Sequence, residues 1–326
     1  MIVITGGAGM IGSMIAWNLN QQGRDDLIIV DRLQQPDQWQ NLCHRRIADY
    51  LDKDELFPWL ESRHEHRKGI DAIIHMGAIS ATTERDFNRL VQENLRYSQH
   101  LWTWCAKHEV PFLYASSAAT YGGGESGYDD REQILRPLNG YGYSKYLFDQ
   151  WVTRQVKTGA ATPPQWCGFK FFNVYGPNEY HKQRMASVVF HTYNQVRDTG
   201  TMQLFKSDRT DVADGMQSRD FIYVKDAASI VTHFLQNPQH SGIFNAGSGE
   251  ARSFRDLAEN VMLSMGKEKS ITWIEMPDDL KGKYQYFTQA NIQKLRAAGY
   301  TQAFTSLEDG IRDYVQNYLM QADSYC

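Results

Sequence analysis

A glycine loop between two strand-like segments constrains the fold more than any other feature of this sequence. Residues 2–5 form a short apolar run, and residues 7–12 follow it with the pattern Gly-x-Gly-x-x-Gly. An amphipathic segment then leads to a second apolar run at residues 27–30, which ends at Asp31. In this context the glycines let the backbone approach a pyrophosphate, and the acid accepts hydrogen bonds from an adenosine ribose. The segment therefore predicts a dinucleotide site, with a tight turn of another α/β protein as the alternative.

Three further apolar runs, at residues 71–75, 111–115 and 165–172, alternate with amphipathic segments. This alternation predicts an α/β fold with a doubly wound parallel sheet of the Rossmann type. The alternation loosens after the last of these runs. We therefore expect a dinucleotide-binding domain at residues 1–170 and a smaller substrate lobe at residues 171–326. Some segments of the lobe should return to the first domain, with the active site in the cleft between them.

Composition and charge exclude several classes of protein. The formal net charge is −4, whereas a nucleic-acid or membrane-surface binder would need a basic excess, so neither partner is expected. The four cysteines lack the close spacing of a zinc or redox site, so no metal is expected. The chain opens without a basic leader, and no apolar run approaches the roughly 18 residues of a membrane span. These features predict a cytoplasmic protein.

The segment from Tyr141 to Lys145 carries the most informative pair of reactive side chains. Residues four apart share one face of a helix, so this phenol and this ammonium point into the same space. A nearby ammonium lowers the pKa of a tyrosine towards the working pH, which allows the phenol to give and take a proton. Taken alone, the pair is better explained as a chance spacing on an ordinary surface helix.

Several motifs along the chain change that interpretation, because they occur in the order found in the extended short-chain dehydrogenase/reductases. They are Thr5-Gly-Gly-Ala-Gly-Met-Ile-Gly12, Ser117 with Tyr121-Gly122, Tyr141-x-x-x-Lys145, Phe172-Asn-Val-Tyr-Gly-Pro177 and Arg219-Asp-Phe-Ile-Tyr-Val224. Within that superfamily the sequence most resembles the ADP-L-glycero-D-manno-heptose 6-epimerases. The segments that carry this closer resemblance are residues 112–121, 138–145, 181–187 and 280–285.

The resemblance implies a reaction and its catalytic residues. The expected reaction inverts C6″ of ADP-D-glycero-D-manno-heptose through a transient 6″-ketone, with tightly bound NADP, and supplies heptose for lipopolysaccharide core synthesis. It implies that Tyr141, Lys145 and Ser117 form the catalytic triad and that Lys182 is the second acid/base residue. Members of the family are homo-oligomers, typically pentamers, so a homo-oligomer is expected here.

The binding positions are expected from the glycine loop, the strand ends and the resemblance together. Those for the cofactor are Gly6, Gly9, Met10, Ile11, Gly12, Asp31, Arg32, Lys53, Met76, Gly77, Ala78, Ile79, Ser80, Asn94, Tyr141, Lys145 and Lys182. Those for the nucleotide sugar are Ser117, Asn173, Arg184, His191, Phe205, Lys206, Ser207, Asp208, Arg219 and Tyr284. Because Arg32 and Lys53 can hold a 2′-phosphate, NADP is favoured, and NAD stays possible.

Simpler structural roles compete with some of these assignments. Asn94 can be a helix-surface amide, Arg219 a buried structural ion-pair partner and His191 a packed side chain. Ser117 can cap a helix, and Asn173 can be a turn residue.

The sequence also departs from the family in three places. Gln38 stands where the family has a basic residue near the cofactor phosphate, and Arg184 stands where it has a small one. Residues 208–218 are an insertion relative to the family pattern. The last two departures touch the nucleotide-sugar side of the expected site.

Three other functions compete with the epimerase assignment. Sugar 4,6-dehydratases carry an Asp-Glu pair just after the catalytic Ser or Thr, where this sequence has Ala118 and Ala119. An epimerase of the UDP-galactose 4-epimerase type uses the same triad and differs on the sugar side. A cofactor-sensing binding protein without chemistry would not need Ser117, Tyr141 and Lys145 together.

Overall fold

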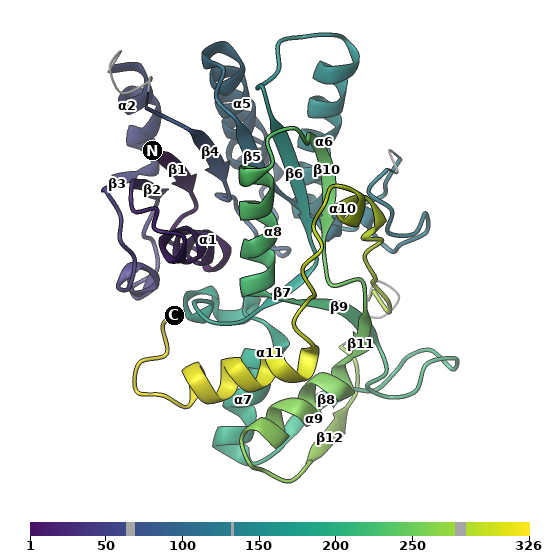
Figure 1. Cartoon of the computed structure of the whole chain (residues 1–326). Coiled ribbons are helices and arrows are strands. Elements are labelled where there is room, and N and C mark those ends of the chain that lie inside the picture. Colours follow the sequence, from purple (N-terminus) through teal and green to yellow (C-terminus); the bar gives the residue numbers. More distant parts are fainter. Residues whose placement is uncertain (63–68, 132–133, 278–284) are drawn as a thin grey trace.

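A seven-stranded parallel sheet forms the centre of the protein (Figure 1). The computed structural model describes residues 1–62, 69–131, 134–277 and 285–326. The strand order is β10-β6-β5-β4-β1-β2-β3, so the predicted doubly wound parallel sheet is confirmed. Its strands are β1 (Ile2–Thr5), β2 (Leu27–Asp31), β3 (Asp49–Asp52), β4 (Ala72–His75), β5 (Phe112–Ser117), β6 (Trp166–Phe171) and β10 (Gly242–Ala246).

Helices cover both faces of this sheet, which is why its strands are apolar on both sides. Ile2 and Ile4 of β1 pack in one core with α1 (Met10–Gln21) and α8 (Val224–Gln236). Val3, between them, points to the other face, and its core includes side chains of the helices behind the sheet. Those helices are α2 (Leu56–Ser62), α5 (Tyr97–His108) and α6 (Gly140–Lys157), and Figure 1 shows α8 on the opposite side of the sheet from α5 and α6.

Short helical segments stand at the strand ends and in the connections. They are η1 (Gln38–Leu42), η2 (Lys53–Glu55), α4 (Phe87–Leu90), the π-helical η3 (Val91–Arg96), η4 (Ala118–Tyr121), η5 (Tyr180–Met185), α10 (Gln293–Ala297) and η6 (Val315–Leu319). Within the described ranges, the structure has no helix that is both long and apolar enough to cross a bilayer.

The second half of the chain builds a smaller lobe below the sheet in Figure 1 and also returns to the sheet. Strand β10 pairs with β6, and α8 packs beside α1. The lobe contains the sheet β11-β9-β7 and the pair β12-β8. The division at residue 170 itself stays a prediction. The lobe elements are β7 (Asn173–Tyr175), α7 (Val188–Thr199), β8 (Met202–Phe205), β9 (Ser218–Tyr223), β11 (Ala251–Ser253), α9 (Phe254–Ser264), β12 (Ile271–Ile274) and α11 (Leu307–Tyr314).

Candidate active site

The glycine loop lies between β1 and α1, and its backbone is packed too tightly for side chains. Gly6 has φ +64°, and a Cβ there would lie 2.5 Å from the backbone nitrogen of Gly77. A Cβ on Gly12 would lie 2.2 Å from the Gly6 carbonyl oxygen. At Gly9 a Cβ would meet only that same oxygen, at 3.1 Å, so this side of the loop is open. The glycines thus expose backbone where a pyrophosphate would approach.

The polar groups around the loop fit a dinucleotide. Helix α1 starts at Met10, and within the described residues its N-cap Gly9 has no side-chain cap and its first turn no acid, so the positive helix end can accept an anion. The Asp31 carboxylate accepts hydrogen bonds from the amides of Ala8 (2.9 Å) and Arg32 (2.7 Å). Burial raises the pKa of Asp31, and these amides oppose that shift. The carboxylate therefore lies at the strand end expected for ribose recognition.

The two cations expected at a 2′-phosphate are each paired with an acid. The Arg32 guanidinium donates to both oxygens of Asp54, at 2.8 and 2.7 Å. The Lys53 ammonium is hydrogen-bonded to Glu93 and lies 4.8 Å from the centre of the Tyr97 ring. These acids were not predicted from the sequence. They compete with any phosphate for the same cations.

Asn94 holds the loop that follows β4, which contains residues 76–80. Its side chain is fully buried in the π-helical segment η3, so the interpretation as a surface amide is wrong. The amide accepts from the Ile79 nitrogen (2.9 Å) and donates to the Ile79 carbonyl (3.0 Å). It also donates to Ser144 (2.9 Å), whose hydroxyl donates to the Tyr141 carbonyl (2.7 Å). Asn94 thus connects the expected cofactor loop to α6.

Ser117 and Tyr141, predicted to act together, lie close enough for the Ser117 side chain to affect the pKa of the Tyr141 phenol. Ser117 ends β5, and Tyr141 lies in the first turn of α6. The Ser117 hydroxyl also accepts from the Ala119 amide (3.1 Å), so it caps η4 as well. Burial raises the pKa of Tyr141, and the neighbouring Ser117 side chain opposes that rise. The structure therefore gives the opposite direction to the lowered tyrosine pKa expected from the sequence.

Lys145 is buried one helical turn after Tyr141. Its ammonium donates to the Ala115 carbonyl at 2.8 Å. Burial lowers the pKa of Lys145 to about 8, and the charge of Asp149 opposes this shift. The ammonium therefore stabilises the end of β5.

Lys182 reaches the glycine loop from the second half of the chain. It lies in η5, and its ammonium is 3.6 Å from the sulfur of Met10, the first residue of α1. Burial lowers the pKa of Lys182, whereas the buried Glu179 carboxylate raises it. The next residue, Gln183, has φ +50° and ψ −123°, a conformation that a non-glycine residue rarely adopts. Such strain is common in functional segments.

Asn173 and Arg219 lie on neighbouring strands of the small lobe. Asn173 is exposed at the start of β7, whose pairing with β9 places it opposite Phe221. Arg219 on β9 is 7% exposed, and its guanidinium lies over the Phe254 ring, 5.5 Å from its centre. It also donates to the Ser218 carbonyl at 3.0 Å. The two residues thus lie on one sheet of the small lobe, and their substrate-binding roles stay predictions.

The remaining substrate positions are spread over the lobe. Arg184 is exposed, and His191 is half-buried on α7. Phe205 ends β8, and the loop after it contacts Tyr286 through the Asp208 amide (2.9 Å). Lys206 is paired with Glu275 (2.7 Å), and Ser207 donates from its amide to Asp214 (2.7 Å). Tyr284 and part of the segment 280–285 lie outside the described residues.

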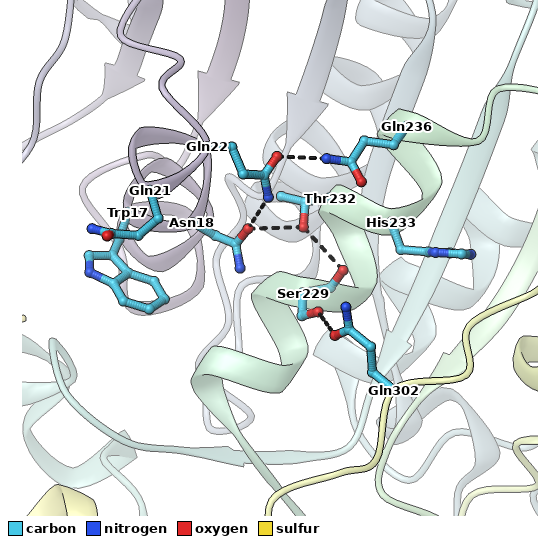
Figure 2. Close-up of a pocket in the computed structure, with 9 residues that line it drawn as sticks. All are labelled: Trp17, Asn18, Gln21, Gln22, Ser229, Thr232, His233, Gln236 and Gln302. Carbon is cyan, nitrogen blue, oxygen red and sulfur yellow. Dashed lines mark hydrogen bonds between the residues drawn. The ribbon is translucent and has the colours of Figure 1, made fainter.

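A surface hollow of about 280 Å³ between α1 and α8 contains none of the predicted residues (Figure 2). Its polar side chains satisfy one another: Gln236 donates to Gln22 (2.7 Å), and Ser229 donates to Gln302 (2.6 Å). We therefore place the active site at the strand ends and not here. The hollow is lined by Trp17, Asn18, Gln21, Gln22, Ser229, Thr232, His233, Gln236 and Gln302.

Comparison with known proteins shows the family to which the chain belongs. The family model described as "NAD dependent epimerase/dehydratase family" matches residues 2–247. A protein of Fusobacterium nucleatum named ADP-L-glycero-D-manno-heptose-6-epimerase is 52% identical over 336 aligned residues, which cover 100% of both chains.

Two solved structures show the same fold. The Helicobacter pylori ADP-L-glycero-D-manno-heptose-6-epimerase has a TM-score of 0.81 and 24% identity, covering 97% of this chain and 95% of that one. The Thermus thermophilus UDP-glucose 4-epimerase in complex with NAD has a TM-score of 0.77 and 23% identity, covering 97% of each chain. The family match supports a nicotinamide dinucleotide as the cofactor of this chain. The chain belongs to the NAD dependent epimerase/dehydratase family.

Proposed function

We propose that this enzyme inverts C6″ of ADP-D-glycero-D-manno-heptose to give ADP-L-glycero-D-manno-heptose. The observation that carries this proposal is the Ser117–Tyr141 pair where β5 ends against α6, in a chain 52% identical over its full length to a protein named for that activity. The enzyme oxidises the 6″-hydroxyl to a ketone and reduces it again from the other face. Substrate and product are therefore at the same oxidation level, and the cofactor is regenerated in each cycle.

The chain's residues handle the substrate oxygen and its proton. A nicotinamide dinucleotide held at the glycine loop would supply the acceptor and donor of the C6″ hydride. The Ser117 hydroxyl hydrogen-bonds the substrate oxygen, and Tyr141 exchanges a proton with it. Lys145 holds the nicotinamide ribose and supplies positive charge beside Tyr141.

Inversion needs proton transfer at two places, because the oxygen moves when the ketone presents its other face. Lys182 is the second proton-transfer group, since it approaches the glycine loop from the other lobe at Met10. Burial lowers the pKa of its ammonium, so this amine can act as a base more readily than an exposed lysine. We assign Tyr141 to one epimer and Lys182 to the other.

NADP is the proposed form of the nicotinamide cofactor. Arg32 and Lys53 would bind the 2′-phosphate, which would replace their present partners Asp54 and Glu93. Gln38 is buried in η1, so Arg32 takes over the role of the basic residue that the family has there. The substrate positions named above would bind the ADP-heptose. We also propose a cytoplasmic homo-oligomer, in line with the family resemblance.

Two other activities of related enzymes are less well supported. A sugar 4,6-dehydratase would need acids at the positions of Ala118 and Ala119, which form the start of η4. A UDP-galactose 4-epimerase activity rests on 4-epimerase structures at 20% and 23% identity, which share the fold alone.

Proton NMR of ADP-D-glycero-D-manno-heptose incubated with the purified enzyme tests the proposal. The expected result is inversion at C6″ without added cofactor, and no inversion at C4 of UDP-galactose. An unchanged heptose spectrum, with the cofactor present in the protein, would contradict the proposed substrate.

Two variants then test the assignment of the bases. Tyr141→Phe and Lys182→Ala should each reduce turnover by about 100-fold or more, the usual loss for a proton-transfer group. Lys107→Ala, which changes an exposed lysine on α5 away from the site, is the matched control and should stay within about threefold of wild type, as expected of a surface substitution. Full activity of Lys182→Ala would refute the two-base mechanism.

A further inference from the structure

A buried carboxylate, Asp149, lies behind the active site and is not used by the mechanism above. It follows Lys145 by four residues on α6 and is 3% exposed. It accepts hydrogen bonds from Tyr114 (3.1 Å), Ser116 (2.7 Å) and Lys170 (2.7 Å). A buried carboxylate with this many donors is held in one orientation.

Lys170 is the cationic partner of this carboxylate and lies near the end of β6, the second strand from the β10 edge of the sheet. It is 2% exposed in β6, between two phenylalanines. Its ammonium donates to Asp149 and to the Thr120 hydroxyl, both at 2.7 Å, and lies 5.1 Å from the centre of the Tyr121 ring. Burying both charges costs desolvation energy, and an apolar pair of similar size is often as stable. The pair therefore needs an explanation other than stability.

Hydrogen bonds connect Asp149 and Lys170 to the segment that carries Ser117. The Thr120 hydroxyl, which accepts from Lys170, donates to the Ser117 carbonyl at 2.8 Å. Ser116 donates its hydroxyl to Asp149, and Lys145 donates to Ala115. Three consecutive residues at the end of β5 are thus fixed to α6, directly or through Lys170. Their position decides how far Ser117 lies from Tyr141.

We propose that Asp149 and Lys170 are positioning residues of this active site, which hold Ser117 against Tyr141 and keep the positive charge on Lys145. The inference rests on the proposed function, because it assigns Ser117, Tyr141 and Lys145 to the reaction. It adds a role for a buried ion pair that touches neither substrate nor cofactor.

The surroundings of Lys145 support the electrostatic part of this role. Asp149 raises the pKa of Lys145 against the effect of burial. Of the other groups that face it, His75 on β4 is neutral, since burial lowers its pKa to about 3. Tyr114 on β5, which donates to Asp149, is also neutral, because burial raises its pKa well above its usual value. The charge that stabilises the Lys145 ammonium therefore comes from Asp149, held in place by Lys170.

The test is a double variant that removes both charges, Asp149→Asn with Lys170→Met. The turnover number should fall about tenfold or more, as for a misplaced catalytic group, while KM for the heptose changes by less than about threefold. The alkaline limb of the pH profile should move to lower pH, since Lys145 loses its proton more easily. The matched control, Lys225→Met with Asp313→Asn, removes a 2.8 Å ion pair elsewhere and should leave the profile unchanged.

Turnover within about twofold of wild type, with an unmoved alkaline limb, would overturn the inference and leave a structural ion pair. The single variant Lys170→Arg keeps Asp149, the positive charge and the hydrogen-bond donors. It should retain most of the wild-type activity if the inference is correct. If the double variant does not fold, Thr120→Val keeps the ion pair but removes the link to Ser117. It should then lower turnover about tenfold without moving the pH limb.

A readout without the sugar separates this inference from the proposed function. The NADP retained by the purified protein after gel filtration can be measured from neutral to alkaline pH. As the pH is raised, the double variant should lose NADP at a lower pH than wild type does. The reason is that only the protonated Lys145 ammonium binds the ribose. Wild type that fails to invert the heptose would refute the proposed function. The retention curves would still decide whether the pair controls Lys145, and coincident curves would refute that control.

Discussion

Gly142 in the first turn of α6 packs directly on Ala119 of η4. A Cβ at position 142 would lie 2.6 Å from the Ala119 carbonyl oxygen, a distance that real Cβ atoms essentially never show. The Gly142 amide is fixed as well, since it donates to the side chain of Asn139, the N-cap of α6, at 2.8 Å. The glycine between Tyr141 and Lys145 therefore sets the approach of the helix that carries Tyr141 to the segment that starts at Ser117.

Gly142→Ala should separate Tyr141 from Ser117. The added methyl group must push the two backbones apart, at a cost of about 1–3 kcal/mol in the free energy of unfolding. We expect turnover to fall about tenfold or more through misplacement of the catalytic pair. Gly140→Ala is the control, because its Cβ would meet the flexible end of Leu90 at 3.1 Å. Equal activities of the two variants would show that this contact does not control the site.

The pH dependence of kcat/KM should show an alkaline limb with an apparent pKa near that of Lys145. Burial lowers the pKa of Lys145 to about 8, so the ammonium is present below this pH and is lost as the pH rises through it. Ribose binding and the positive charge beside Tyr141 are lost with it. Initial rates measured across this range check the prediction. A kcat/KM that stays constant up to about two pH units above neutral would exclude this role for the ammonium.

His75 should make the protein less stable in mild acid. The His75 ring is hydrogen-bonded to the Thr5 hydroxyl and, at 2.9 Å, to the Ser98 hydroxyl. Its burial lowers its pKa to about 3. The unfolded chain takes up this proton near pH 6.5, whereas the folded protein does not, so stability is lost as the pH falls below that value. The loss is at most about 1.4 kcal/mol per pH unit for each such group.

Denaturant unfolding from about pH 7 to about pH 5 measures this loss, and His75→Gln should roughly halve the slope. It should not abolish the slope, because burial also lowers the pKa of His181, to about 4. A slope that is unchanged in the variant would show that His75 takes up its proton in the folded protein.

Arg32 should decide between the two nicotinamide dinucleotides. Arg32→Ala should weaken NADP binding by about tenfold, the value of one charge-assisted contact, and leave NAD binding unchanged. Asp54→Asn frees the same guanidinium and should strengthen NADP binding by at most about fivefold, because exposed ion pairs are weak. Equilibrium titration of cofactor-depleted protein distinguishes these outcomes. Equal losses for both dinucleotides would point to a general role of Arg32 in folding or in ribose binding.

Local sequence patterns were sufficient to predict the parallel sheet, the glycine loop and the Tyr141–Lys145 pair. Each depends on neighbours in the chain: a period, a turn or a spacing of four. The acids that pair with Arg32 and Lys53 could not be predicted in this way, because the partners come from η2 and η3.

Asp149 and Lys170 were missed for a similar reason. They meet only because β6 lies next to β5 and under α6, which is a property of the strand order. One sequence signal for them existed. A lysine inside the apolar strand Phe169-Lys170-Phe171 requires a buried partner, and Asp149 extends the helical face of Tyr141 and Lys145 by one more turn.

The return of β10 to the sheet has a consequence for how the chain is made. The edge of β6 obtains its hydrogen-bonding partner only when residues 242–246 have left the ribosome, and α1 is covered only when α8 has been synthesised. Until then the nascent nucleotide half exposes an open strand edge and an apolar helix face, the features that attract chaperones and promote aggregation. A fragment that stops at residue 170 should therefore be insoluble on its own, and co-expression with residues 171–326 should recover it as a two-fragment complex.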